Sequence, residues 1–136
     1  MKLATGVVGV EWSMVASVQP AFDAAWGGPS GMYASRLGAL RSARLNPLAS
    51  LARAGLTLAF GSDSPVTPFA PWEAVRAAAF HHTPEHRMSV RGAFAAHTRG
   101  GCRAAGDDEG GVLVPGAPAS YAIWEVETDL VVQAPD

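Results

Sequence analysis

The feature that most constrains this chain is an apolar run that ends abruptly in polar residues. Residues 56–60 read LTLAF, and GSDSP follows at residues 61–65. An almost wholly apolar run of this length is typical of a strand in a parallel sheet that is buried on both faces. Polar residues at the carboxyl end of such a strand are where α/β folds place their chemistry. Asp63 is therefore the first candidate functional residue.

A second β-prone run lies upstream, at Val15 to Val18, and stops at a Gln-Pro pair. Proline lacks the backbone donor that a ladder needs, so the run is expected to be a strand that leads into a loop. The following segment, AFDAAWGGPSG at residues 21–31, has turn-forming stretches and is long enough for a functional loop. Gln19, Asp23 and Trp26 are candidates to line a substrate pocket, and a purely structural role in the loop is the alternative.

The chain between the two strands is predicted to be helical. Apolar residues recur near helical spacing from Met32 to about Arg44, with an interruption at Gly38. A second helix is expected after Asn46 as its N-cap, with Pro47 in the first helical position and Gly55 at its end. Strand, helical crossover and strand make a βαβ unit, in which the two strands are parallel.

The C-terminal half is predicted to begin with helices and to end with strands. Pro71 opens an alanine-rich helix that runs to Phe80, and Ser89 is the expected N-cap of another helix from Val90 to about Thr98. Two β-prone runs then follow at residues 110–116 and 121–126, separated by a turn that contains Pro and Gly. These two runs indicate a small β element attached to the α/β part.

Together these segments resemble the C-terminal portion of the amidohydrolase superfamily, in the branch called amidohydrolase family 3. Members of that branch typically hydrolyse amide or other carbon–nitrogen bonds on a metal-bearing (β/α)8 barrel. VASVQPAFD resembles the seventh barrel strand and its loop, AGLTLAFGSDSPV the eighth strand, and GVLVPGAPASYAIWEV the returning strands of the β-sandwich. The last stretch has Ser120 where the family usually has Asp, in a turn away from the chemistry.

The resemblance implies a division of the chain and a place for it in a larger fold. Residues 1–109 would be the C-terminal part of the TIM barrel, with strands seven and eight and their helices. Residues 110–136 would be strands of the associated β-sandwich. The fold class expected is therefore α/β, with a small β element appended.

The resemblance also gives Asp63 a role. In this superfamily the aspartate after the eighth strand ligates or lies beside the divalent metal, and it takes the proton of the metal-bound water. The cation lowers the pKa of that water towards about 7 and keeps the carboxylate ionised. Asp63 is thus implied as catalytic residue and metal ligand, zinc as the metal, and an amide-like small molecule as substrate. A helix N-cap or turn residue is the structural alternative for Asp63. Ser64 is a candidate substrate contact, with turn hydrogen bonding as its alternative.

The histidines and the cysteine are expected to be structural. His81 and His82 lie beyond the family's ligand positions, and adjacent helical residues point about 100° apart, so both cannot easily face one ion. They are predicted to be helix C-terminal cations or surface residues. His86 is predicted to be solvated and His97 to pack near the last helix, and Cys102 is predicted to be a buried thiol.

Several parts of the family pattern are missing from the sequence. They are the His-x-His of the first strand, the Lys or Glu of the fourth, and the histidines of the fifth and sixth. A complete barrel needs about 250 residues, whereas this chain has 136. We therefore expect a C-terminal fragment with an incomplete metal site, inactive alone, whose partner is the missing N-terminal half of the barrel or another copy. The alternative is a non-catalytic α/β interaction or structural module derived from such an enzyme.

Charge and hydropathy exclude several other classes of partner. The formal net charge is -2, and Lys and Arg are scattered singly, so neither nucleic acid nor an anionic membrane surface is expected to bind. The apolar stretch at the N-terminus is interrupted by Glu11, which argues against a signal peptide. No run approaches the roughly 20 apolar residues of a membrane span. A cytoplasmic protein is expected.

Overall fold

A two-stranded parallel sheet organises the computed structural model, which describes residues 14–125. Strand β1 is Val15–Val18 and strand β2 is Thr57–Phe60, paired in register from Val15 with Thr57 to Val18 with Phe60. The crossover between them consists of four short helices: α1 (Ala21–Trp26), α2 (Met32–Leu37), α3 (Ala39–Ser42) and α4 (Leu48–Arg53). The predicted βαβ unit with parallel strands is confirmed.

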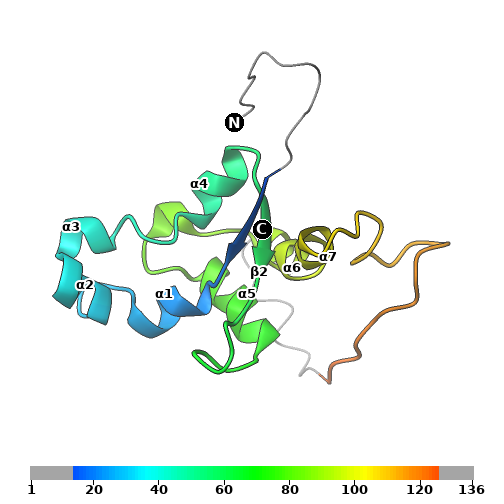
Figure 1. The fold of residues 1–136 in the computed structure, drawn as a ribbon. Coiled ribbons are helices and arrows are strands. Elements are labelled where there is room, and N and C mark those ends of the chain that lie inside the picture. The colour runs from blue at the N-terminus through cyan, green and yellow to red at the C-terminus, as the bar shows by residue number, and fades with distance from the viewer. Residues whose placement is uncertain (1–13, 126–136) are drawn as a thin grey trace, which may run out of the picture.

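After β2 and a turn at residues 61–70, the chain up to residue 104 is mainly helical. It contains α5 (Pro71–Ala79), the 3-10 helix η1 (Pro84–His86), α6 (Val90–His97) and α7 (Arg99–Ala104). Pro71 opens α5 as predicted, and Ser89 caps α6 by accepting a hydrogen bond on Oγ from the Gly92 N–H at 3.1 Å. In Figure 1 the strands stand at the centre, with α1 to α3 on one side of them and α6 and α7 on the other.

The core lies where β2 meets α4, α5 and α6. Leu58 and Phe60 of β2 pack there with Leu48 of α4 and Val75 of α5. Fully burying a side chain of this size contributes about 1.5–3 kcal/mol. The helices meet the strand through alanines, which permit close approach: Ala78, Ala93 and Ala96. As predicted, β2 is the buried strand, whereas Val15 and Ser17 of β1 are exposed.

Helix α7 packs tightly against the sheet at one glycine. Gly100 lies directly against the Leu58 carbonyl, and a Cβ atom at position 100 would overlap that oxygen. The neighbouring Gly101 has open space around its own Cβ direction. A glycine at position 100 is therefore a packing requirement of the contact between α7 and β2.

Two local predictions in the crossover are wrong. The segment 21–31 is not an irregular loop throughout, because residues 21–26 form α1. Asn46 is not the N-cap of α4; that position belongs to Pro47, and Asn46 has a left-handed φ of 50°. The left-handed backbone accounts for the second difference, because an N-cap residue typically has extended backbone, whereas asparagine also tolerates the left-handed region.

The predicted C-terminal β element is also absent from the part that the structure describes. Residues 110–125 contain turns and extended chain but no strand, and Leu113 and Ile123 are 76% and 88% exposed. A β-prone run needs a partner strand, and within residues 14–125 only β1 and β2 pair. One aromatic contact does hold this segment: Trp124 lies edge-on to Trp72 with ring centroids 6.0 Å apart. Residues 1–13, which include Glu11, and residues 126–136, which include the last residue of the second β-prone run, lie outside the described residues.

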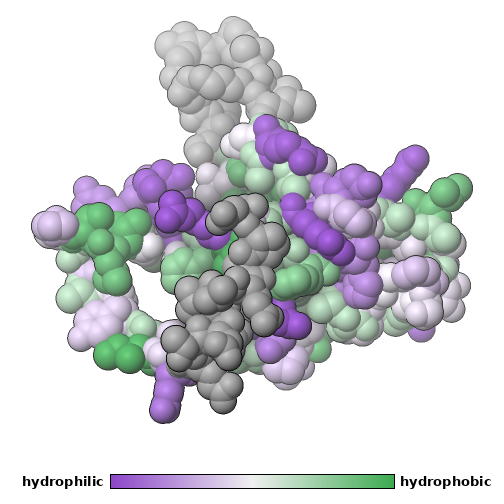
Figure 2. All heavy atoms as spheres, turned by 180° about the vertical axis from the view of Figure 1, so that it is seen from behind, coloured by the Kyte–Doolittle hydropathy of each residue, from purple (hydrophilic) through white to green (hydrophobic). Residues whose placement is uncertain are grey.

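The surface combines polar and apolar side chains. Green and purple patches lie side by side on the face shown in Figure 2. At the start of β1, Met14 is 62% exposed, and the edge of β1 opposite β2 has no partner strand within residues 14–125. None of the helices described reaches the length and apolarity that crossing a bilayer requires.

Candidate active site

The carboxyl ends of the two strands lie at the same end of the sheet, which we call the rim. The Gly61 N–H donates to the Val18 carbonyl at 3.1 Å, so the ladder continues from the last residue of β1 to the residue that follows β2. Gln19 therefore leaves β1 at the same edge where Ser62 and Asp63 leave β2. The parallel pairing predicted from the βαβ unit thus brings Asp63 and the Gln19 loop to the same end of the sheet.

Asp63 lies on a turn whose backbone is held in place. The Val66 N–H donates to the Asp63 carbonyl at 2.8 Å, and the buried Thr67 hydroxyl donates to the Ser62 carbonyl. Asp63 itself has a left-handed φ of 53°, a conformation that is uncommon outside glycine but tolerated by aspartate. Such residues often lie at functional sites.

The side chain of Asp63, in contrast to its backbone, is free. It is exposed, and within residues 14–125 its carboxylate has no hydrogen bond or ion pair. It does not cap a helix, because Ala70 precedes α5 and no side chain caps that helix. The N-cap alternative for Asp63 is therefore wrong, although the residue does lie in a turn. Ser64, the neighbouring candidate substrate contact, is exposed as well.

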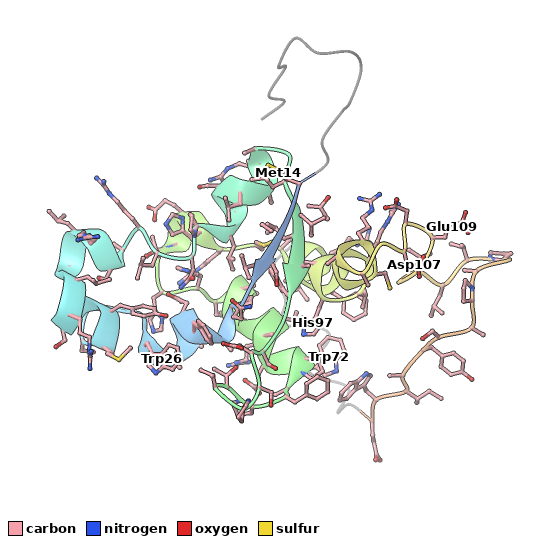
Figure 3. The ribbon with its side chains drawn as sticks, in the orientation of Figure 1. Met14, Trp26, Trp72, His97, Asp107 and Glu109 are labelled. Carbon is pink, nitrogen blue, oxygen red and sulfur yellow. The ribbon has the colours of Figure 1, made fainter. Side chains whose placement is uncertain are left out.

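Trp26 is the last residue of α1, the helix that follows the carboxyl end of β1. Its ring contacts Phe22 at a centroid distance of 4.8 Å and Tyr33 at 6.1 Å. Figure 3 shows Trp26 and Trp72 towards the end of the molecule opposite Met14, beyond the carboxyl ends of the strands. No hydrogen bond, ion pair or ring contact within the described part of the chain joins Asp63 to Gln19 or Trp26.

Asp23, the remaining candidate, is buried among histidines. It is 5% exposed, and its Oδ2 accepts a hydrogen bond from the His82 backbone N–H at 2.9 Å. The same oxygen lies 3.0 Å from Nδ1 of His82. Its Oδ1 lies 3.3 Å from Nε2 of His81, which is 1% exposed. One buried carboxylate therefore faces two consecutive histidines.

The prediction that His81 and His82 are helix-terminal cations or surface residues is thus wrong for His81, and incomplete for His82, whose side chain is 42% exposed. Helix α5 ends at Ala79, so the two histidines lie beyond it and the 100° helical separation does not apply. The Thr83-Pro84 pair was the available signal, because the residue before a proline avoids the helical region.

Hydrogen bonding determines which nitrogen of His81 carries the proton. Nδ1 accepts from the Thr83 N–H at 3.0 Å, so in the neutral ring the proton is on Nε2, which faces Asp23. The geometry of the Nε2 contact is not that of a hydrogen bond, so the attraction is electrostatic. Burial lowers the pKa of His81, the Asp23 carboxylate opposes this by raising it, and nearby His86 lowers it further.

His86 completes this cluster and is another correction. Its ring lies edge-on to His81 with centroids 5.3 Å apart, and both of its ring nitrogens are buried without a hydrogen-bond partner. It is therefore not the solvated residue predicted. Burial, followed by the Asp23 carboxylate, raises the pKa of Tyr33, and the nearby Asn46 side chain partly offsets this.

The described residues do not form a metal site by themselves. Within residues 14–125, no three His, Cys, Asp or Glu side chains are placed to hold a metal ion. His97, at the end of α6, and Cys102, in α7, are both partly buried. A pocket of about 170 Å³ opens beside His82 and Asp23, where Glu73, Arg76 and Phe80 of the α5 region line it.

Comparison with known proteins gives a consistent result. The sequence model described as "Amidohydrolase family" matches residues 10–136. An uncharacterized metal-dependent hydrolase from Pyrococcus furiosus superposes with a TM-score of 0.66 and 27% identity, covering 79% of this chain and 22% of that one. One from Pyrococcus horikoshii OT3 has a TM-score of 0.63 and 26% identity, covering 76% of this chain and 22% of its own. No curated protein sequence matches the chain.

Proposed function

The chain belongs to the amidohydrolase family, and on that premise we propose that it supplies Asp63 to the active site of a metal-dependent hydrolase. The observation that carries the proposal is the state of Asp63. Its backbone is held in a left-handed turn at the carboxyl end of β2, while its carboxylate is exposed and unengaged within residues 14–125. A carboxylate that accepts no hydrogen bond from its neighbours is free to accept a proton from a reacting group.

The reaction we propose is hydrolysis of an amide-like carbon–nitrogen bond that is not a peptide bond. Water adds to the carbonyl carbon, Asp63 accepts the proton that the water loses, and that proton passes to the leaving nitrogen as the bond breaks. A positioned general base typically accelerates such a step by about 10²–10⁴-fold. Gln19, Trp26 and Ser64 lie along the same rim and are the proposed substrate contacts.

The divalent metal of the family fits these residues only in part. Catalytic zinc, the metal we propose, generally uses three protein ligands and a water. Asp63 is the one ligand that we assign within residues 14–125, where no group of three is placed for a metal. The other ligands would have to come from outside these residues.

A partner that completes the barrel is therefore part of the proposal. The chain covers 22% of the length of each Pyrococcus hydrolase. The outer edge of β1 has no partner in the described residues, and open strand edges favour pairing with another chain. We propose that the earlier strands of a barrel, or failing those a second copy of this chain, pair with β1. A cytoplasmic location is proposed as well.

The test compares the 136-residue chain alone with the same chain joined to the part of the Pyrococcus furiosus hydrolase that it does not cover. We expect bound metal, measured by elemental analysis, and amide hydrolysis only in the joined form. Chelator-sensitive turnover by the chain alone would contradict the need for a partner. A joined form that binds metal but hydrolyses no amide or ester would contradict the hydrolase assignment and favour a non-catalytic module.

A further inference from the structure

The rim helix α1 is fastened to the segment after α5 through one side chain. Both carboxylate oxygens of Asp23 face that segment: Oδ2 lies 2.9 Å from the His82 backbone nitrogen and 3.0 Å from His82 Nδ1. Oδ1 lies 3.3 Å from His81 Nε2. Hydrogen bonds to an ionised acceptor are about twice as strong as neutral ones, and burial strengthens them further. Asp23 is thus a strong connection between residues distant in sequence.

The histidine side of this connection is itself held. The Thr83 N–H donates to His81 Nδ1 at 3.0 Å, and Arg87 Nε donates to the His81 carbonyl at 2.9 Å. The Met88 N–H donates to the Ala78 carbonyl at 3.0 Å, which returns the chain to α5. The two histidines are therefore a fixed anchor for the carboxylate.

The aspartate side leads directly to the proposed substrate contacts. The Asp23 N–H donates to the Pro20 carbonyl at 3.0 Å, and the Asp23 carbonyl accepts from the Gly27 N–H at 2.7 Å. Gln19 and Trp26 are the residues that flank these two bonds. A displacement of Asp23 would consequently move both of them.

The anchor is also connected to Asp63. Helix α5 is the element that follows the Asp63 turn, and His81 and His82 lie just beyond its end. A continuous series of contacts therefore links the Asp63 turn to Gln19. It runs through α5 to the two histidines, from these to the Asp23 carboxylate, and along α1 to Gln19 at the end of β1.

We propose that Asp23 is a positioning residue, which with His81 and His82 sets where Gln19 and Trp26 stand relative to Asp63. Asp23 then influences the substrate only through Gln19 and Trp26. This indirect role replaces the direct substrate contact that the sequence led us to expect. The importance of this positioning for turnover rests on the proposed function, but the positioning itself does not.

The test uses the 136-residue chain labelled with 5-fluorotryptophan, with the Trp26 fluorine resonance identified by Trp26→Phe. In Asp23→Asn we expect that resonance to shift while those of Trp72 and Trp124 stay in place. Backbone exchange at His82 should accelerate about tenfold or more, as for the loss of a charged acceptor. Asp108→Asn is the matched control, because that carboxylate is 86% exposed and 3.6 Å from Arg103.

His82→Ala is the second variant, because it removes the Nδ1 contact but keeps the backbone donor to Asp23. We expect a smaller shift of Trp26 in the same direction. This variant decides the matter if Asp23→Asn does not fold. A Trp26 resonance that stays in place, or one that moves only together with Trp72 and Trp124, would overturn the positioning role. Neither measurement requires turnover, so a failure of positioning is distinguishable from an absence of hydrolysis.

Discussion

Two aspartates at the same rim have opposite surroundings. Asp63 is exposed, has a left-handed φ of 53°, and its carboxylate has no partner within residues 14–125. Asp23 is 5% exposed, and both of its oxygens face histidines. A carboxylate already engaged by its neighbours stabilises the fold, whereas an unengaged one is available to a substrate. Surroundings rather than residue type therefore separate the aspartate that we propose as proton acceptor from the one that is engaged within the fold.

The sharpest way to break this comparison is Asp63→Asn in an active, completed form of the enzyme. We expect hydrolysis to fall by about 10²–10⁴-fold, because the proton acceptor is lost. The free energy of unfolding should change by less than about 0.5 kcal/mol, since the side chain is exposed and asparagine tolerates left-handed backbone. Initial rates and urea denaturation measure the two effects. Equal activity with asparagine at this position would contradict the role of Asp63.

The converse change, Asp23→Asn, should act on stability first. It replaces one of the two carboxylate oxygens by an amide donor, which then faces either the two nitrogens of His82 or Nε2 of His81. A buried donor left without an acceptor in this way is costly. We expect the free energy of unfolding to fall by about 3 kcal/mol. Urea denaturation beside Asp108→Asn measures it. A loss equal to that of the exposed control would show that the carboxylate contributes nothing to the fold.

The pH dependence of stability should come from the buried cluster of Asp23 and His81. Because the pKa of His81 is lowered from its ordinary value of 6.5, the unfolded chain binds this proton more readily than the native one. The stabilisation is fully present above that pH and is lost as the pH falls below it, by at most about 1.4 kcal/mol per unit. Denaturation at several pH values should show this slope.

His81→Asn tests the source of that slope, because its side-chain oxygen can still accept from the Thr83 N–H. The variant should have a flatter dependence on pH below 6.5 than the wild type. Parallel profiles for wild type and His81→Asn would assign the pH dependence to other groups.

The smallest effect is expected from the backbone support of Asp63. Thr67→Val removes the hydroxyl that bonds to the Ser62 carbonyl and should cost about 1 kcal/mol. Ser42→Ala, which loses an exposed bond to the Ala39 carbonyl, is the control and should cost less. If Thr67→Val leaves both stability and activity unchanged, the turn is held by other contacts.

The sequence predicted the parts of the fold that depend on local pattern. The apolar run at β2, the short strand β1 and the Ser89 cap follow from periodicity and capping chemistry, which act over a few residues. The parallel pairing followed from the helical crossover. The position of Asp63 at the carboxyl end of β2 needed no long-range information.

What escaped prediction depends on contacts between distant segments. Asp23 and His82 are 59 residues apart in sequence, and His81 is the neighbour of His82. No local pattern indicates a pairing over such a separation. The β-prone runs at 110–116 and 121–125 satisfied the local pattern but have no partner strand in residues 14–125. In both cases the outcome depended on the surroundings of the segment.

The contact of Gly100 with the Leu58 carbonyl limits how this chain can be recombined with its relatives. A chimera that exchanges α6 and α7 must keep a glycine at this one position, because even a methyl group there would force α7 away from β2. Gly101 imposes no such condition. In a library of variants the two neighbouring glycines should therefore differ sharply in tolerance, and a segment taken from a homologue should preserve the core only if it carries glycine at position 100.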